Sequence, residues 1–215
     1  MRKALVLLSG GLDSAAALWW AKKRYEVYAL TFRYGRLNKR EMRAARKLAR
    51  IAGVKKHFVI DVNFLKEVSE VDWMKERLSL KKTKMPSIYI PSRNTIFFGI
   101  ASHISEIFGI NSIITGHSFL DPFPDSKPDY VKSMNDAVNY GSWLGRRFRT
   151  KIVMPIYRMN KTEVLKFALR EKIPLESTWS CYKETKYACG ECNGCKNRLQ
   201  AFGELGIDDR IKYQN

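Results

Sequence analysis

The feature that most constrains the fold is a short apolar run that ends in two glycines. Residues 3–8 read Lys-Ala-Leu-Val-Leu-Leu, and Ser9-Gly10-Gly11 follows directly. Residues 13–23 have helical spacing with an acidic first turn, so the segment predicts a strand, a tight loop and a helix. Because a strand that continues into a helix reaches its next strand by a crossover, such a unit favours a parallel sheet.

The rest of the chain repeats this alternation of apolar runs and helical stretches. We expect further strands at residues 25–32, 57–60, 112–116 and 152–154, and helices at 39–52, 93–108, 131–144, 161–171 and 196–205. The pattern predicts an α/β fold, a doubly wound parallel sheet covered by helices on both faces. We divide the 215 residues into a main domain at 1–172 and a small C-terminal unit at 173–215.

Two segments are expected to be loops. Residues 62–90 show only weak helical signals at 64–77 and a Lys-rich stretch, so a mobile loop is expected there. Residues 117–130 hold three prolines and three aspartates directly after an expected strand. Because open α/β sheets bind ligands at the carboxyl ends of their strands, this second loop lies at the expected ligand edge.

The chain carries a formal charge of +18, and the excess is concentrated at its beginning. Residues 1–50 contain 13 Lys or Arg against 3 Asp or Glu, which accounts for +10 of the total. At helical spacing these form one basic face: Arg36, Arg40, Arg43, Lys47 and Arg50. A solvated helix face is the simpler interpretation, and a contact surface for phosphate or RNA is the alternative.

Near the C-terminus four cysteines follow a C-x7-C-x2-C-x2-C pattern: Cys181, Cys189, Cys192 and Cys195. Neither a signal-peptide core nor a membrane span is evident, so we expect a cytoplasmic protein whose cysteines bind a metal rather than form disulfides. Four thiolates at this spacing suit one tetrahedral, structural Zn²⁺ per chain. An iron–sulfur cluster is the alternative, because the C-x2-C-x2-C run also occurs around such clusters.

The loop Ser9-Gly10-Gly11-Leu12-Asp13-Ser14 has the chemistry of a phosphate cradle. Glycines let a phosphate approach the backbone, the helix N-terminus directs N–H groups at the anion, and two serines add hydroxyl groups. Since a carboxylate repels bare phosphate, Asp13 predicts a Mg²⁺ that bridges the phosphates. The Walker pattern is excluded, because no Gly-Lys-Ser/Thr follows. The motif resembles the PP-loop of N-type ATP pyrophosphatases, which implies AMP transfer with loss of pyrophosphate.

Other polar residues are weaker candidates. Arg93 opens an expected helix and is a candidate phosphate clamp, although an isolated arginine at a helix start is more often a solvated charge. We interpret His103, on the same helix, as a packing or surface residue. His117 follows an expected strand and is a second candidate for the lining of the site.

Taken together, these motifs resemble the 7-cyano-7-deazaguanine synthase family, QueC, over nearly the whole chain. Besides the loop at 9–14, the resemblance rests on Tyr34-Gly35, Pro91-Ser92-Arg93-Asn94, Pro124-Asp125 and Thr178-Trp179-Ser180-Cys181-Tyr182 with the later cysteines. It implies an adenine nucleotide alpha hydrolase-like fold and conversion of 7-carboxy-7-deazaguanine, ATP and ammonia to the nitrile used for queuosine and archaeosine tRNA bases. It also implies zinc on the four cysteines, Mg²⁺ with ATP, and a homodimer.

The resemblance assigns roles to individual residues. ATP binding falls to Leu8, Ser9, Gly10, Gly11, Leu12, Asp13, Ser14, Ala15, Ala16, Ala17 and Leu18. Catalysis falls to Ser9, Asp13, Ser14 and Arg93, and substrate binding to Tyr34, Asn94, Asp125 and Lys127. Asp125 is the expected reader of the deazaguanine base, because an ionised carboxylate accepts hydrogen bonds from the N1–H and the exocyclic amine together. A solvated turn aspartate is the alternative.

Two departures from the family pattern leave the acceptor open. The family usually has Tyr-Gly-Gln-x-His where this chain reads Tyr34-Gly35-Arg36-Leu37-Asn38, and Pro-Asp-Cys-Arg-Pro-Glu-Phe where it reads Pro124-Asp125-Ser126-Lys127-Pro128-Asp129-Tyr130. One alternative is a related PP-loop enzyme that adenylates another acid, a protein or tRNA. Another is a zinc-ribbon nucleic-acid-binding protein without catalysis. Direct tRNA binding by the enzyme is not expected, although the basic N-terminal part keeps it open.

Overall fold

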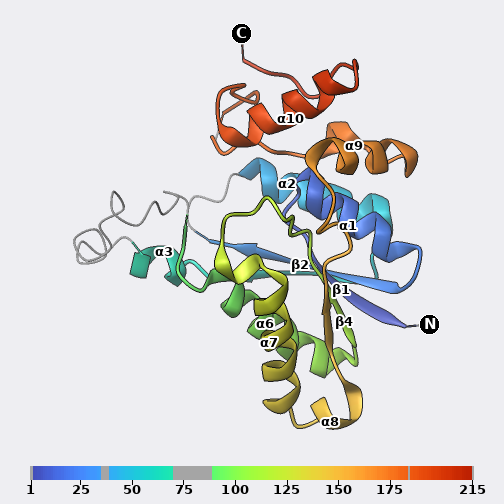
Figure 1. The fold of residues 1–215 in the computed structure, drawn as a ribbon, viewed down its shortest axis with the longest axis vertical. Coiled ribbons are helices and arrows are strands. Elements are labelled where there is room, and N and C mark those ends of the chain that lie inside the picture. Colours follow the sequence, from blue (N-terminus) through green and yellow to red (C-terminus); the bar gives the residue numbers. More distant parts are fainter. Residues whose placement is uncertain (1, 35–38, 70–88, 184, 215) are drawn as a thin grey trace.

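A computed structural model describes residues 2–34, 39–69, 89–183 and 185–214, which form a five-stranded sheet with helices on both faces (Figure 1). The strands are β1 (Lys3–Leu7), β2 (Glu26–Arg33), β3 (His57–Asp61), β4 (Ser112–Ile114) and β5 (Lys151–Val153). Neighbouring strands pair in parallel in the order β3-β2-β1-β4-β5. The expected doubly wound parallel sheet is confirmed.

Helices alternate with these strands along the chain. They are α1 (Leu12–Lys22), α2 (Lys39–Ala52), α3 (Phe64–Ser69), α6 (Arg93–Phe108), α7 (Pro128–Tyr140), α8 (Gly145–Phe148), α9 (Lys161–Arg170) and α10 (Asn193–Glu204). One face of the sheet carries α1, α2 and α9, and the other carries α6 and α7 (Figure 1). Among the described residues, no helix has both the length and the apolar character needed to cross a bilayer.

Side chains of β1 alternate between two hydrophobic cores. Ala4 and Val6 belong to the core that β1 shares with α1, α2 and α9. Leu5 belongs to the core on the other face, which is built from α6 and the far sides of β2 and β4. A strand buried on both faces needs apolar side chains at every position, which is why residues 3–8 read as an almost uninterrupted apolar run.

Two helices have bounds that differ from those expected from the sequence. The helix expected at 131–144 is α7, which begins at Pro128 because the fixed φ of proline suits the first helical position. It ends at Tyr140, directly before Gly141. The helix expected at 196–205 is α10, which begins at Asn193. Within the segment expected to be a mobile loop, α3 confirms the first part of the helical signal, and residues 70–88 lie outside the described residues.

The C-terminal tail packs on the main unit through α10, which lies against α9 (Figure 1). Arg198 of α10 is only 1% exposed. It donates to both carboxylate oxygens of Asp209, to the Thr178 hydroxyl at 2.6 Å and to the Leu175 carbonyl at 3.1 Å. A buried charge with this many partners holds the surrounding tail in one arrangement.

The division into a main domain and a C-terminal unit at residue 172 stays a prediction.

The strand order reverses direction between β1 and β4, so the loops that follow these two strands meet at the carboxyl edge of the sheet. Gly116 follows β4 and touches the start of α1. A Cβ atom on it would lie 2.9 Å from both the Asp13 carbonyl carbon and the Ser14 nitrogen, which is too close for any side chain. Such a reversal point is where open α/β sheets bind their ligands.

Candidate active site

Residues 9–14 form the tight turn after β1 and the first residues of α1. The Ser14 hydroxyl donates to the Gly11 carbonyl at 3.0 Å and accepts from the N–H and the hydroxyl of Ser9 at 3.2 Å and 3.0 Å. Gly11 is the N-cap residue of α1, and no side chain caps this helix end. The first N–H groups of a helix have no partner within the helix, so here they are available to an anion.

Gly10 sets how α2 and the tail pack against this loop. Its φ is +93°, and an added Cβ would lie 2.4 Å from the Glu41 carbonyl oxygen and 2.8 Å from the Ala45 nitrogen. The Gly10 carbonyl accepts the N–H of Trp179 at 2.9 Å. Three segments therefore meet at a position that only glycine can occupy without a shift of the backbone.

A cavity of about 350 Å³ lies beside the loop at the reversal point. Of the residues assigned from the sequence, it is lined by Leu8, Ser9, Gly11, Asp13, Ser14, Tyr34, Arg93 and Asn94. The assigned residues that do not line it are Gly10, Leu12, Ala15, Ala16, Ala17, Leu18, Asp125 and Lys127. Residues 12 and 15–18 are buried in the core between α1 and the sheet, so they support the loop from behind.

The carboxylate of Asp13 pairs with a lysine from a distant part of the chain. Lys161, the first residue of α9, donates to it at 2.5 Å, with side-chain exposures of 28% for Lys161 and 30% for Asp13. Asp121, on the loop after β4, lines the same part of the cavity and accepts the Ser118 N–H at 2.9 Å. Burial raises the pKa of Asp121, the nearby Asp13 carboxylate raises it further, and Lys161 opposes the shift. Neither Asp121 nor Lys161 lies in a motif that would identify it from the sequence alone.

Arg93 stands among aromatic rings at the start of α6. Its guanidinium lies 5.9 Å from the ring centroids of Tyr34 and Phe97 and 5.5 Å from that of Phe123. Nη1 donates to the Tyr34 hydroxyl at 3.3 Å, while the buried Nε has no partner among the described residues. The rings hold the cation in place by cation–π attraction. The role of Arg93 as a phosphate clamp stays a prediction.

Asp125 contacts Asn94 rather than the cavity. One carboxylate oxygen accepts the Asn94 backbone N–H at 2.9 Å and the other accepts its side-chain amide at 3.0 Å. Lys127 donates to the backbone carbonyls of Phe119 and Asp121. Both residues thereby shape the loop that leads to α7, and their predicted substrate contacts stay predictions.

Two further ionisable groups line the cavity. Burial raises the pKa of Glu41 on α2 to about 7, and no hydrogen bond to its carboxylate occurs within the described residues. Burial, aided by the charge of Arg93, lowers the pKa of His117 to about 4. The His117 Nδ1 is buried and has no partner in the described part of the chain. At neutral pH His117 is therefore uncharged, while Glu41 is close to its midpoint of titration.

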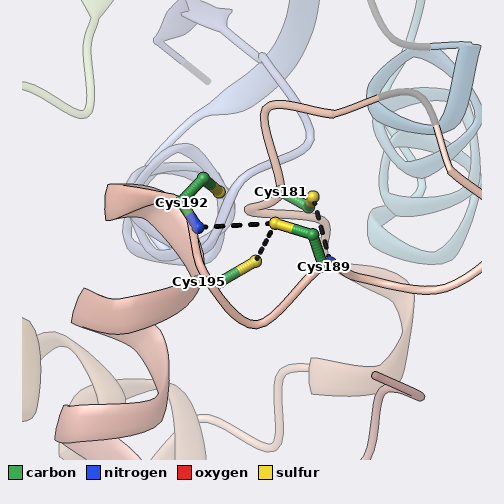
Figure 2. A group of neighbouring side chains, drawn as sticks. All are labelled: Cys181, Cys189, Cys192 and Cys195. Atoms are coloured by element: carbon green, nitrogen blue, oxygen red, sulfur yellow. Dashed lines mark hydrogen bonds between the residues drawn. The ribbon is translucent and has the colours of Figure 1, made fainter. Parts of the chain in front are cut away.

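The four cysteines converge where the tail enters α10 (Figure 2). Their sulfur atoms all lie within 4.8 Å of one another, and those of Cys189 and Cys195 are 3.9 Å apart. In a tetrahedral site with metal–sulfur bonds of about 2.3 Å, the sulfurs are about 3.8 Å apart. Backbone N–H groups donate to the sulfurs of Cys181, Cys189 and Cys192, which favours their thiolate forms. The tail therefore contains a four-cysteine cluster whose geometry suits a metal ion.

Comparison with known proteins gives the family of this chain and its relatives. A profile of the family described as "Queuosine biosynthesis protein QueC" matches residues 3–206. The chain belongs to the QueC family. A 7-cyano-7-deazaguanine synthase from Thermoplasma volcanium is 35% identical and aligns over 99% of this chain and 91% of its own. One from Thermosynechococcus vestitus is 38% identical over 99% of this chain and 96% of its own.

A solved structure supports the fold of this QueC family member. A predicted subunit of tRNA methyltransferase from Methanocaldococcus jannaschii superposes with a TM-score of 0.53, covering 100% of this chain and 93% of its own. At 17% identity this likeness concerns the fold alone. Of the two departures from the QueC pattern, residues 35–38 lie outside the described residues, and residues 124–130 form a short 3₁₀ turn, Pro124–Ser126, and the start of α7.

We expect Gly10→Ala to lower the melting temperature more than Gly53→Ala does. Both glycines have positive φ, +93° and +71°, so each replacement costs about 1–2 kcal/mol of left-handed backbone strain. An added Cβ at Gly53 meets nothing within 4 Å, whereas at Gly10 it meets the backbone of α2. Thermal unfolding should show several further degrees of loss for Gly10→Ala, since 1 kcal/mol corresponds to about 2–4 °C in a chain of this size. Equal shifts would mean that α2 does not fix the loop.

Proposed function

We propose that this QueC family member converts 7-carboxy-7-deazaguanine, ATP and ammonia to 7-cyano-7-deazaguanine through an adenylated carboxylate. Relatives of that name align with it over nearly their full length. The observation that carries the proposal is the loop at residues 9–14, a phosphate cradle at the reversal point of the sheet. The adjoining cavity of about 350 Å³ lies in the usual size range of small-molecule sites.

The loop suits pyrophosphate as a leaving group. A substrate carboxylate oxygen attacks the α-phosphorus of ATP, and the bond from that phosphorus to the bridging oxygen breaks. Pyrophosphate leaves with the electron pair. The N–H groups at the start of α1 and the hydroxyls of Ser9 and Ser14 are placed to stabilise the charge that develops on it. Binding and positioning, rather than a protein nucleophile, then account for most of the rate.

Ammonia supplies the nitrogen in this proposal. All four cysteines of the chain lie in the metal cluster, which leaves no thiol for a built-in glutaminase. Ammonia attacks the carbonyl carbon of the adenylate, and AMP leaves to give the amide. In a second round the amide oxygen attacks the α-phosphorus of another ATP, and pyrophosphate leaves. Departure of AMP with the former amide oxygen, and loss of the two amide protons, then gives the nitrile. Formation of a homodimer stays a prediction, as does the cytoplasmic location.

The charged groups beside the loop fit an ATP–magnesium complex. Asp13 and Asp121 offer carboxylate oxygens, which are the ligands that Mg²⁺ takes in proteins. Mg²⁺, when bound, neutralises charge on the phosphates. Lys161 is paired with Asp13 and brings a second cation to the same place. We infer that Lys161 contributes to stabilising the departing pyrophosphate.

The reaction products test the proposal. Incubation with ATP, ammonium and 7-carboxy-7-deazaguanine should yield AMP, pyrophosphate and a product of the mass of the nitrile, measured by chromatography and mass spectrometry. Without ammonium, exchange of labelled pyrophosphate into ATP should persist, since adenylation precedes amide formation. ADP and phosphate as the only nucleotide products would overturn the proposal. Exchange with another acid, but not with this one, would indicate a related enzyme with a different acceptor.

Two carboxylates are candidates for reading the deazaguanine base. Asp125 is the residue predicted from the sequence, and its oxygens already accept two hydrogen bonds from Asn94. Each oxygen retains a second lone pair for a ligand. Glu41 lines the cavity directly, and no hydrogen bond to its carboxylate occurs in the described residues. Replacement of each by its amide separates the two roles.

We expect Asp125→Asn to raise the KM for the deazaguanine acid about ten- to a hundredfold, because a charge-assisted hydrogen bond is worth about 1.5–3 kcal/mol. The KM for ATP should hardly move. Glu41→Gln is the matched variant. A rise confined to Glu41→Gln would transfer the role to Glu41.

The stability of Glu41→Gln gives a separate test. Burial raises the pKa of Glu41 to about 7, so its ionised form destabilises the fold above that pH. Glu41→Gln should therefore not lower the melting temperature at pH 8.

We propose that the metal of the cysteine cluster is Zn²⁺, one per chain. Four thiolates close a tetrahedral shell and leave no open position, so the role is structural. Elemental analysis should find one zinc in the wild type and in Ser180→Ala, a neighbouring variant that keeps the ligands, and none in Cys192→Ser. Because a structural zinc contributes local folding free energy, Cys192→Ser should make the tail sensitive to protease while the sheet persists. Iron in the purified protein would reject zinc.

A further inference from the structure

A second hollow, of about 430 Å³, lies between α2 and the C-terminal tail and shares no lining residue with the catalytic cavity. It is lined by six basic side chains and one acidic one, Glu176. Three basic residues come from α2 and three from the tail: Arg40, Arg43, Lys47, Lys186, Arg210 and Lys212. The lining therefore carries a formal charge of +5.

Five of the six basic groups form no ion pair within the described part of the chain. Within the described residues no carboxylate forms an ion pair with Arg43, Lys47, Lys186, Arg210 or Lys212. Like charges that converge from two segments repel one another and weaken the contact between those segments. Their positive potential concentrates anions in the hollow.

Two buried donors in the same wall also lack partners. Ser177 is 5% exposed and Trp179 is 8% exposed, and both line the hollow. The Ser177 hydroxyl and the Trp179 Nε1–H have no hydrogen-bond partner among the described residues. A buried donor without a partner destabilises the fold, and an acceptor that binds to it removes this cost. The oxygens of a phosphate bound in the hollow are acceptors that would give these donors partners.

We propose that this hollow binds a single-stranded nucleic acid through successive phosphates, independently of the proposed catalytic reaction. The basic row continues beyond the hollow, because Arg50 follows Arg43 and Lys47 at helical spacing and is exposed. At a rise of 1.5 Å per residue this row spans about 10 Å of α2, with the basic residues of the tail opposite. One phosphate cannot engage groups so far apart, whereas a strand can.

Other occupants fit the surface less well. A membrane is flat and does not enter a concave hollow. A second copy of the chain also carries +18, so it does not supply the net negative charge that this hollow attracts, whichever face a homodimer would use. A strand of nucleic acid carries one negative charge per nucleotide and gains affinity by releasing its counterions. Trp179 connects the hollow to the active site, because its N–H donates to the Gly10 carbonyl of the phosphate loop at 2.9 Å.

Fluorescence anisotropy with a labelled twelve-nucleotide uridine RNA tests the proposal. Affinity should fall with salt between 50 and 200 mM KCl with a log–log slope of about −2 to −4, as each contacted phosphate contributes about 0.7 for a single strand. The double variant Arg43→Glu/Lys47→Glu should bind about tenfold more weakly or worse. Trp179→Phe, which keeps the charge and removes one donor, should weaken binding about two- to tenfold with an unchanged slope.

The matched control is Lys132→Glu/Lys151→Glu, which changes net charge equally at exposed positions on α7 and β5. Its RNA affinity should stay within about twofold of the wild type. Circular dichroism and pyrophosphate exchange should show that both double variants are folded. Equal weakening by both pairs would overturn the proposal. So would stronger competition by polyglutamate or by anionic vesicles than by unlabelled RNA, or a change of oligomeric state in light scattering caused by Arg43→Glu/Lys47→Glu.

Discussion

The contact of three backbone segments at Gly10 is the constraint on which the active site depends. The loop after β1 can reach the backbone of α2 only because Gly10 has no side chain, and the same residue accepts the N–H of Trp179. Through this contact α2 carries Glu41 to the cavity. The tail segment continues from Trp179 to Cys181, so a metal bound by the cysteines would help to hold the loop at residues 9–14 in place. The proposed metal and nucleotide sites would then be linked through a few backbone atoms.

Charge is distributed unevenly over this strongly basic chain. The carboxylates of Asp13, Glu41 and Asp121 line the catalytic cavity, although its proposed ligand is an anion. Carboxylates beside phosphates are tolerated only with cations between them, which is the part that Lys161 and a bound Mg²⁺ would take. The hollow beside α2 has the opposite composition, with cations and unpaired donors. The two proposed sites would therefore select their ligands by different means.

Much of the fold and part of the site could be predicted from local patterns. Residues 3–23 are one strand, loop and helix, and each of these is specified by neighbours in the sequence. The last three cysteines are three residues apart, so one turn brings them together wherever the tail lies. Helix ends were predicted less well, as at Pro128 and Asn193, because the hydrophobic pattern begins later than the helix does.

The sequence by itself therefore determined the alternating strands and helices, the Gly-rich loop at residues 9–14 and the four-cysteine pattern, since each is marked by the residue types of one short segment. Only the tertiary structure decided which distant side chains meet. Lys161 is 148 residues from Asp13 in the sequence, yet the two side chains pair. In the sequence, Glu41 is an acidic residue on a basic helix, and only the packing of α2 against Gly10 brings it to the cavity. The Asp125 carboxylate accepts a hydrogen bond from the backbone N–H of Asn94, which has no partner within α6 because it lies in the first turn of that helix. Contacts of this kind depend on how whole elements pack, and no local pattern specifies that packing.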